Sequence, residues 1–344
     1  MDDYLEGITN KAVLDALLKA KSVFQRHFNI MISVSGGSDS DVILDISEKV
    51  KGNRKVTYVW FDTGLEYQAT KDHLKYLENK YQIEIERIKA IKPIPQCVHE
   101  YGVPVFSKYA SDYLGRLQRV GFDWSDGEYE ELVGKYDNSV STLKWWCNWH
   151  TIQDGRVSYF SIERIRLLKE FIMENPPDFP IANLCCEYSK KRPAKKFKKE
   201  RESDLDVTGI RKAEGGIRAA SYKNCFTPGE DHADTFRPIF YFTDADKEYY
   251  CEHFGVKHSA CYEVYGFKRT GCVGCPYNQR VLEDLKATEI YEPKLYKACM
   301  NVFGKAYEYT QKFREYRAKR KAEVQPDSEI EQMSLFDMNY DFLG

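Results

Sequence analysis

The sequence predicts an α/β protein built on a doubly wound, mostly parallel sheet. Three segments have the apolar patterning of buried strands, at residues 29–35 (NIMISVS), 55–61 (KVTYVWF) and 82–89 (QIEIERIK). Two segments between them, at about 41–50 and 66–81, have the apolar period of helices. Strands that alternate with helices form parallel βαβ units, and the fold class follows from that order.

The alternation stops after residue 92 and resumes later. Residues 93–180 contain clustered tryptophans and polar turns and are expected to form a largely helical insertion. Sheet-like patterning returns at 205–211 (LDVTGIR) and 237–243 (RPIFYFT), and residues 282–321 are predicted to be helical. Residues from 326 on are expected to form a mobile tail.

Composition excludes some function classes. The 51 Lys and Arg residues nearly balance the 53 Asp and Glu residues, so a nucleic-acid partner needs a local argument rather than a global one. No run of about 18 apolar residues occurs, which predicts a cytoplasmic protein with no membrane partner. Ten cysteines in such a protein are more often metal ligands or reactive thiols than disulfides.

An anion-binding loop is predicted between the first strand and the first helix, where backbone N–H groups and the helix dipole favour a phosphate. Its residues are Ser35, Gly36, Gly37, Ser38, Asp39 and Ser40. The glycines let a phosphate approach the backbone, the hydroxyls can donate to its oxygens, and Asp39 can hold a bridging Mg²⁺. The alternative is an ordinary Gly-Gly turn with a helix cap.

The loop sequence SGGSDS resembles the SGGxDS signature of the PP-loop ATP pyrophosphatases. The second strand ends in Asp62, Thr63 and Gly64, which begin a DTGLEYQAT segment similar to the DTG…ET element of the phosphoadenosine phosphosulfate (PAPS) reductases. Further on, Arg211 and Arg218 lie in a segment resembling GxRxxES…R, which implies that they bind phosphate or sulfate through their planar guanidinium groups. Either arginine could instead be an ordinary surface residue.

The resemblance covers roughly residues 29–90 and 181–280. It implies a PP-loop nucleotide-binding core, of the adenine nucleotide alpha-hydrolase type, whose halves are residues 1–92 and 181–280. The insertion at 93–180, C-terminal helices at 281–325 and the tail at 326–344 complete the expected organisation.

Four cysteines form a candidate metal site. Cys185 and Cys186 are adjacent, and Cys272 and Cys275 form a CxxC loop that ends at Pro276. A CxxC loop alone is compatible with zinc, iron–sulfur or redox chemistry, and a Cys-Cys pair with simple burial. The segment CCEYSKKRP resembles the CCxxRKxxP element of the iron–sulfur sulfonucleotide reductases, which implies a 4Fe-4S cluster on these four thiolates.

Zinc remains an alternative for the four cysteines, and Cys261 is a competing ligand. Cys261 competes because related sulfur-inserting enzymes, including the ATP pyrophosphatase of DNA phosphorothioation, hold their ligands near the CxxC loop.

The sequence departs from the reductase pattern at its C-terminus. The nucleophilic ECGLH-like motif is absent, and the last cysteine, Cys299, lies inside a predicted helix. A mobile thiol of low pKa is needed for the reductase route, so adenylation chemistry is favoured. The candidate sulfur-carrying nucleophile is Cys147, because Lys144 to Cys147 (KWWC) resembles an element of the phosphorothioation pyrophosphatases and Lys144 could lower its pKa. The alternative is a buried thiol.

Two segments suggest partners. The stretch from Lys190 to Arg201 holds eight basic residues in twelve and could neutralise a nucleic acid, although such runs are usually solvated helix faces. In the tail, Gln332 to Phe336 (QMSLF) resembles the peptide by which bacterial proteins dock on the sliding clamp, with a tail folded onto its own core as the alternative.

The sequence therefore predicts an ATP-dependent enzyme that forms AMP and pyrophosphate, carries a 4Fe-4S cluster and acts in sulfur transfer or modification of a nucleic acid or nucleotide. A cysteine desulfurase or another donor would supply the sulfur. The alternatives are a reductase of PAPS or adenosine phosphosulfate and a non-catalytic nucleotide-binding regulator.

Overall fold

The computed structural model describes residues 3–136, 139–149, 161–215, 221–229 and 233–324. The chain forms two compact units, and each is described by itself. Unit 1 consists of Met1–Ile94, Glu187–Val273 and Ala287–Leu295. Unit 2 consists of Pro95–Cys186, Gly274–Lys286 and Tyr296–Gly344.

Unit 1 contains a six-stranded sheet in the order β3-β2-β1-β4-β6-β5. Its strands are β1 Asn29–Ser33, β2 Lys55–Asp62, β3 Ile85–Lys89, β4 Leu205–Val207, β5 Phe226–Thr227 and β6 Asp234–Phe236. All neighbours are parallel except β5 and β6, which are antiparallel. The prediction of a doubly wound, mostly parallel sheet is confirmed. The strand order reverses at β1, since β2 and β3 lie on one side of it and β4 on the other.

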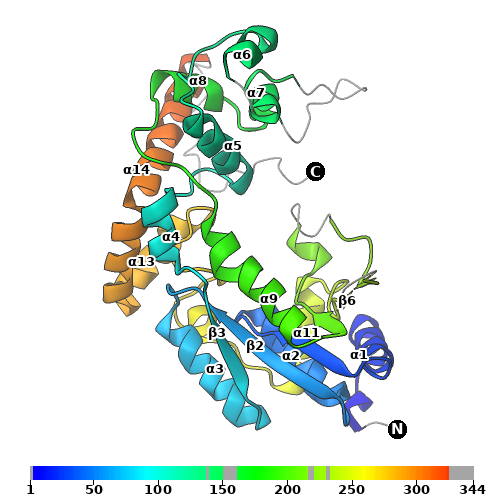
Figure 1. Ribbon diagram of the computed structural model, residues 1–344. Coiled ribbons are helices and arrows are strands. Elements are labelled where there is room, and N and C mark those ends of the chain that lie inside the picture. The colour runs from blue at the N-terminus through cyan, green and yellow to red at the C-terminus, as the bar shows by residue number, and fades with distance from the viewer. Residues whose placement is uncertain (1–2, 137–138, 150–160, 216–220, 230–232, 325–344) are drawn as a thin grey trace. The chain divides into compact units, whose positions relative to one another are not determined.

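Helices cover both faces of this sheet. In unit 1 they are α1 Lys11–Phe24, α2 Ser38–Val50, α3 Gln68–Tyr81, α9 Arg192–Glu200, α11 Asp244–Phe254 and α12 Ala260–Glu263, with short helical turns at Asp3–Leu5, Glu187–Lys191 and Lys212–Glu214. α9 crosses one face of the sheet, and α2 lies on the other (Figure 1).

The alternation of side chains along β1 explains this double covering. Ile30 and Ile32 point into the larger core with α1, α2 and α3, whereas Met31 points to the opposite face and packs with Phe197 of α9. All three β1 side chains are buried, as expected for a strand in a sheet with two covered faces.

One strand prediction is wrong. Residues 237–243 follow β6 rather than forming it, and they make successive turns in which Phe240 N donates to Arg237 O and Phe242 N to Ile239 O. Pro238 has no N–H for a strand ladder. Ile239, Phe240 and Phe242 are nevertheless buried, so their apolar pattern reflects burial of a turn and not a strand.

Helices make up the regular structure described in unit 2. They are α5 Lys108–Arg119, α6 Tyr129–Lys135, α7 Val140–Trp146 and α8 Leu168–Glu174, with a 3-10 turn at Ile162–Arg164. Three more helices contain residues of both units. They are α4 Ile94–Tyr101, α13 Val281–Tyr291 and α14 Pro293–Val324.

Aromatic rings fill the core of unit 2. Phe171 of α8 contacts Tyr309 and Phe313 of α14, and Phe122 packs edge-on against Trp146 of α7. In the part of the chain that the structure describes, no helix is both long and apolar enough to cross a membrane.

Candidate functional site

The predicted phosphate loop connects the carboxyl end of β1 to the first turn of α2. Gly36 has φ +69°, and a Cβ there would lie 2.7 Å from Cγ2 of Thr70, so this position needs glycine. The Ser40 hydroxyl accepts a hydrogen bond from Ser35 N at 3.2 Å and donates to Gly37 O at 2.8 Å. Ser40 therefore stabilises the shape of the loop through its own backbone.

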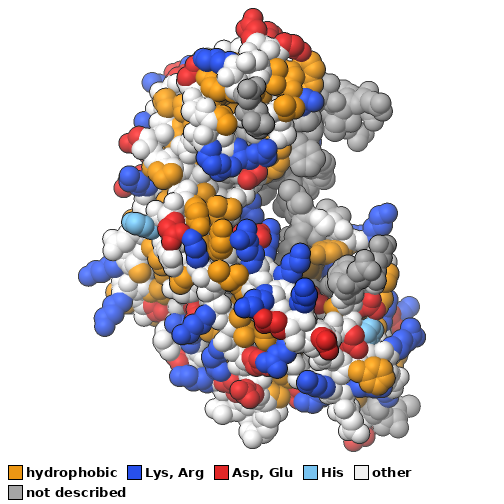
Figure 2. All heavy atoms as spheres, viewed as in Figure 1, with side chains coloured by type: hydrophobic (Ala, Val, Ile, Leu, Met, Phe, Trp, Pro, Cys, Tyr) orange, Lys and Arg blue, Asp and Glu red, His pale blue; other side chains and the backbone are white. Residues whose placement is uncertain are grey.

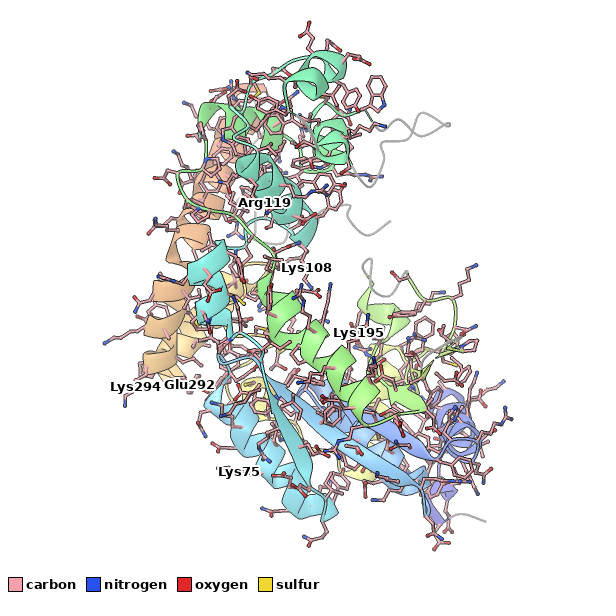
Figure 3. The ribbon with its side chains drawn as sticks, in the orientation of Figure 1. Lys75, Lys108, Arg119, Lys195, Glu292 and Lys294 are labelled. Atoms are coloured by element: carbon pink, nitrogen blue, oxygen red, sulfur yellow. The ribbon has the colours of Figure 1, made fainter. Side chains whose placement is uncertain are left out.

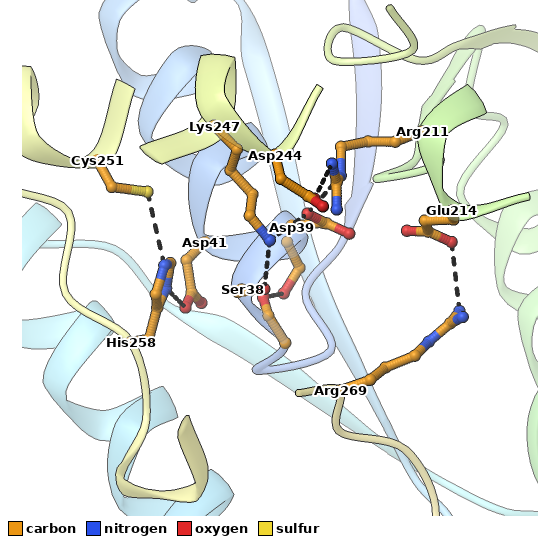
Figure 4. A network of polar contacts seen from close by, with 12 residues as sticks. Ser38, Asp39, Asp41, Arg211, Glu214, Asp244, Lys247, Cys251, His258 and Arg269 are labelled. Carbon is orange, nitrogen blue, oxygen red and sulfur yellow. Dashed lines mark hydrogen bonds and ion pairs between the residues drawn. The ribbon is translucent and has the colours of Figure 1, made fainter. Parts of the chain in front are cut away.

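Asp39 is the charged centre of the site. Its Oδ1 lies 3.0 Å from Nε of Arg211 and 3.2 Å from Nζ of Lys247, and that Nζ is also 3.1 Å from the Ser38 hydroxyl (Figure 4). Burial opposes ionisation of Asp39, but its hydrogen bond with Glu214 and the charges of Lys247 and Arg211 outweigh burial and lower its pKa. Asp39 is therefore a carboxylate at neutral pH.

Arg211 reaches Asp39 from the loop that follows β4. Its side chain is buried, so the alternative of an ordinary surface arginine is wrong, and it also contacts Asp244 at 2.8 Å. A Cβ on Gly209 would lie 3.3 Å from the main chain of Asp39, so the two loops approach closely. Because β1 and β4 are adjacent at the point where the strand order reverses, the loops after them flank the crevice where open α/β sheets bind ligands.

Glu214 completes a pair of carboxyl groups with Asp39. Burial raises the pKa of Glu214 to about 7, and the hydrogen bond to Asp39 adds to this effect. The Arg269 guanidinium, 3.4 Å away, acts in the opposite direction. The pKa of Glu214 is thus raised and that of Asp39 lowered, so the two neighbouring carboxyl groups differ in their tendency to ionise.

Asp62, Thr63 and Gly64 form the turn at the end of β2, the strand beside β1. Asp62 Oδ1 accepts a hydrogen bond from Gly64 N at 2.9 Å. Gly64 has φ +81°, and a Cβ there would meet Pro93 at 2.7 Å. Thr63 is buried and donates to Glu66 at 2.6 Å. Thr63 therefore fixes the turn, whereas Asp62 lies on the same sheet edge as the phosphate loop.

A buried cluster of one carboxylate and two histidines stabilises the first turn of α2, directly after the phosphate loop. Asp41, fully buried in the first turn of α2, lies 3.0 Å from His73 of α3 and 2.9 Å from His258. Burial opposes protonation of His258, but the hydrogen bonds to Asp41 and Cys251 outweigh it and raise its pKa to about 9 (Figure 4). Asp41 thereby fastens the loop helix to two other segments.

Sequence reasoning missed several residues of this site. Glu214 was noticed only as part of a motif, and Lys247, Tyr262, Arg269 and Thr270 were not singled out. Their only sequence signal is that all five are polar and lie within about 60 positions after β4, which is too weak to identify them.

The ten cysteines are all described, and all are free of disulfides. Cys185 is buried, and Cys186, Cys272 and Cys275 are partly exposed. In unit 2, Cys185, Cys186 and Cys275 lie near the buried Tyr277 hydroxyl. Burial raises the pKa of this hydroxyl, Ser111 lowers it, and the three thiols add to the rise. Among the described residues, no group of three or more potential ligands has metal-site geometry.

Cys261 belongs to unit 1, where it lies in α12. It is fully buried, and its sulfur lies 3.8 Å from the Thr70 hydroxyl. Burial raises the pKa of its thiol to about 11, which disfavours the thiolate that a metal needs.

Cys147 follows α7 in unit 2, and its sulfur is 3.7 Å from Gly127 O. Burial raises the pKa of its thiol, with Lys169 opposing and Asp126 adding to the shift. The expectation that Lys144 lowers this pKa is wrong, because the Lys144 ammonium lies over the ring of Tyr129 instead.

The basic stretch forms α9 and the turn before it. Phe197 turns inward to the sheet, and Lys195 projects outward (Figure 3). Several of the cations have carboxylate partners, including Lys198 with Asp206. On the face shown in Figure 2, Lys and Arg side chains are interspersed with Asp and Glu. The stretch is thus not a field of uniformly positive charge.

Two predicted features lie outside the described residues. These are Arg218 and the tail segment that contains Leu335 and Phe336.

Comparisons with known proteins show similarities in part of the chain. Residues 29–119 match the family model of the phosphoadenosine phosphosulfate reductase domain. An uncharacterised protein of Methanocaldococcus jannaschii is 24% identical over 311 residues, which are 89% of this chain and 48% of the relative. The chain thus spans about half the length of this curated relative.

Solved structures with some likeness include three enzymes. The PAPS reductase of Candida auris is 15% identical, with a TM-score of 0.40 over 77% of this chain and 96% of that one. An NH3-dependent NAD synthetase of Campylobacter jejuni is 13% identical, with a TM-score of 0.34 over 87% and 94%. The U34-tRNA thiolase of Methanococcus maripaludis, solved with its 4Fe-4S cluster, is 11% identical, with a TM-score of 0.38 over 87% and 80%.

The family match covers β1 and the loop that follows it, and the sheet order places this loop where the strand order reverses. The family match is confined to residues 29–119, and this part of the chain is similar to the phosphoadenosine phosphosulfate reductase domain.

Proposed function

We propose that this protein is an ATP-dependent PP-loop enzyme that forms AMP and pyrophosphate in the course of sulfur transfer to, or modification of, a nucleic acid or nucleotide. The observation that carries the proposal is the grouping of Asp39, Arg211 and Lys247 beside the phosphate loop at the reversal of strand order. Two cations and backbone N–H groups around one anion-binding turn suit a polyphosphate.

In the proposed reaction an acceptor oxygen attacks the α-phosphorus of ATP and pyrophosphate leaves. The phosphate loop, Arg211 and Lys247 stabilise the charge that develops on the leaving group, because their donors are already fixed by contacts with Asp39. A sulfur nucleophile would then attack the activated carbon or phosphorus of the acceptor, and the bond from that atom to the adenylated oxygen would break, so that AMP leaves with this oxygen.

We place the proposed Mg²⁺ ion at this carboxyl pair. Asp39 is ionised because its pKa is lowered, and the pKa of Glu214 is raised to about 7, so a divalent cation would compete with the proton on Glu214. The Asp39 and Glu214 oxygens would hold the ion, which would supply charge neutralisation on the phosphates.

Cys185, Cys186, Cys272 and Cys275 remain the proposed ligands of a 4Fe-4S cluster. Their support is the buried hydroxyl of Tyr277, which lies near Cys185, Cys186 and Cys275. The nearby Ser111 hydroxyl already bonds both main-chain groups of Val105. The Tyr277 O–H is therefore suited to donate to thiolate or sulfide. When bound, such a cluster supplies a one-electron redox centre.

The family match makes sulfonucleotide reduction the second candidate. It requires a reactive thiol, and Cys299 does not supply one, because burial raises its pKa to about 12. Cys147, whose pKa is also raised, would need activation by a partner or substrate. Adenylation chemistry needs no such thiol for its first step.

Product analysis tests the proposal. Anaerobically purified protein is incubated with ATP or with PAPS, and the products are resolved by ion-exchange chromatography. AMP with pyrophosphate is expected from ATP, and Asp39→Asn should abolish their formation while the circular dichroism spectrum stays unchanged. Sulfite from PAPS would support the reductase instead, and nucleotide binding without turnover would support a regulator.

A further inference from the structure

Tyr262 contacts the phosphate loop from the segment that leads to the CxxC cysteines. Its hydroxyl accepts a hydrogen bond from the backbone N–H of Ser38 at 3.1 Å. A Cβ on Gly37 would lie 3.3 Å from the same hydroxyl. The Tyr262 oxygen therefore lies directly against the backbone at the start of α2.

The same hydroxyl holds Thr270. Thr270 N donates to it at 3.1 Å, and the Thr270 hydroxyl lies 2.9 Å from it. Thr270 also approaches the loop itself, since a Cβ on Gly37 would be 3.2 Å from Oγ1 of Thr270. One oxygen thus joins the phosphate loop to a residue two positions before Cys272.

The Ser38 N–H belongs to the first turn of α2, whose N–H groups have no partner within the helix. Such N–H groups bind phosphate oxygens at helix N-termini. One N–H makes one strong hydrogen bond, so a phosphate oxygen that accepts it must displace the Tyr262 hydroxyl.

A second contact ties the same segment to the site. Arg269, adjacent to Thr270, pairs with Glu214 at 3.4 Å, and Asp39 contributes to the raised pKa of Glu214. Binding of a cation by Asp39 and Glu214 would change the charge that Arg269 faces. Phosphate and cation would therefore act on one short segment at two neighbouring residues.

We propose that Tyr262 and Thr270 form a latch, meaning that the Tyr262 hydroxyl joins Ser38 of the phosphate loop to Thr270. A nucleotide phosphate that binds Ser38 N displaces this hydroxyl and opens the latch, so that occupation of the phosphate loop is coupled to the position of Cys272. The proposal rests on the proposed function insofar as the loop binds ATP. Tyr262 acts as a positioning residue, because it works through Ser38 and Thr270 and not on the reacting atoms.

The test uses the full chain and hydrogen exchange measured by mass spectrometry. Wild type, Tyr262→Phe and Tyr265→Phe are compared with no addition, with Mg²⁺ and ATP, and with Mg²⁺ and inorganic pyrophosphate. Tyr265 is the matched control, since its hydroxyl bonds Glu292 at 3.1 Å and not the loop. Dissociation constants for both ligands are measured in parallel by calorimetry.

In wild type and Tyr265→Phe, either ligand should slow exchange in residues 35–40 and accelerate it in peptides containing residue 270. In Tyr262→Phe, the residue 270 peptides should exchange quickly without ligand and change no further. Ligand affinity of Tyr262→Phe should be higher by about two- to tenfold, because the phosphate no longer displaces a neutral hydrogen bond.

The outcomes separate the two proposals. Ligand binding with unchanged exchange at residue 270 in wild type would overturn the latch and leave the proposed function standing, and this result needs no variant to fold. The expected exchange pattern without AMP formation would overturn the function and keep the latch. Failure of wild type to bind either ligand would overturn both.

Discussion

The raised pKa of Glu214, beside the ionised Asp39, predicts a specific pH dependence of metal-assisted nucleotide binding. Glu214 is an acid whose pKa is raised to about 7, so it is neutral below that pH and ionised above it. Asp39 stays ionised throughout, because its pKa is lowered. If Mg²⁺ needs both carboxylates, its affinity must rise as the pH rises through about 7.

The size of the effect follows from the titration of Glu214. With a pKa of about 7, roughly 3% of Glu214 is ionised at pH 5.5 and roughly 90% at pH 8. The Mg²⁺-dependent part of ATP binding should therefore strengthen about 30-fold over this range, or about 2 kcal/mol. Phosphate ionisation of ATP contributes too, so the variant comparison decides the result.

The assay is calorimetric titration of ATP at pH 5.5, 6.5, 7.5 and 8, with and without Mg²⁺. Glu214→Gln, which cannot ionise, should lose the pH dependence that exceeds that of free Mg²⁺ and ATP. Asp244→Asn is the matched control, because Asp244 also contacts Arg211 but its carboxylate is largely exposed. Equal pH profiles for wild type and Glu214→Gln would refute the reasoning.

Three further predictions concern other parts of the protein. Arg211→Ala should weaken ATP binding by about 1.5–3 kcal/mol, the usual size for a charge-assisted contact, and unchanged affinity would leave Arg211 a structural partner of Asp39. The anaerobic wild type should contain iron and acid-labile sulfide in near-equal amounts, and Cys272→Ser or Cys275→Ser should lose both, whereas zinc alone would remove the cluster. A peptide of the C-terminal tail should bind a bacterial sliding clamp in the micromolar range, and Leu335→Ala with Phe336→Ala should abolish binding, so equal signals from both peptides would withdraw the clamp as a partner.

The sequence alone predicted the parts of the protein that depend on local pattern. Five elements were recognisable, because the apolar period of a strand or helix depends only on neighbouring residues. These are β1, α2, β2, α3 and β3. The phosphate loop was recognisable for the same reason, since its glycines, hydroxyls and helix start are contiguous.

The local sequence pattern led to a wrong prediction where a buried turn and a strand have the same run of apolar residues. Residues 237–243 are as apolar as a strand, but Pro238 and the successive turns place them after β6. The environment of Cys147 could not be predicted from local sequence either. Lys144 precedes Cys147 by three positions but contacts Tyr129, whereas the more distant Asp126 adds to the rise in the pKa of the thiol.

Tertiary structure decided which charges meet at the loop. Arg211 and Lys247 are far from Asp39 in sequence, and only the adjacency of β4 to β1 and the position of α11 bring them to its carboxylate. The pKa of Glu214 and the contact of Tyr262 with Ser38 arise in the same way. A motif specifies which groups are present, but electrostatic and hydrogen-bond energies depend on distance and burial, and these exist only once the chain has folded.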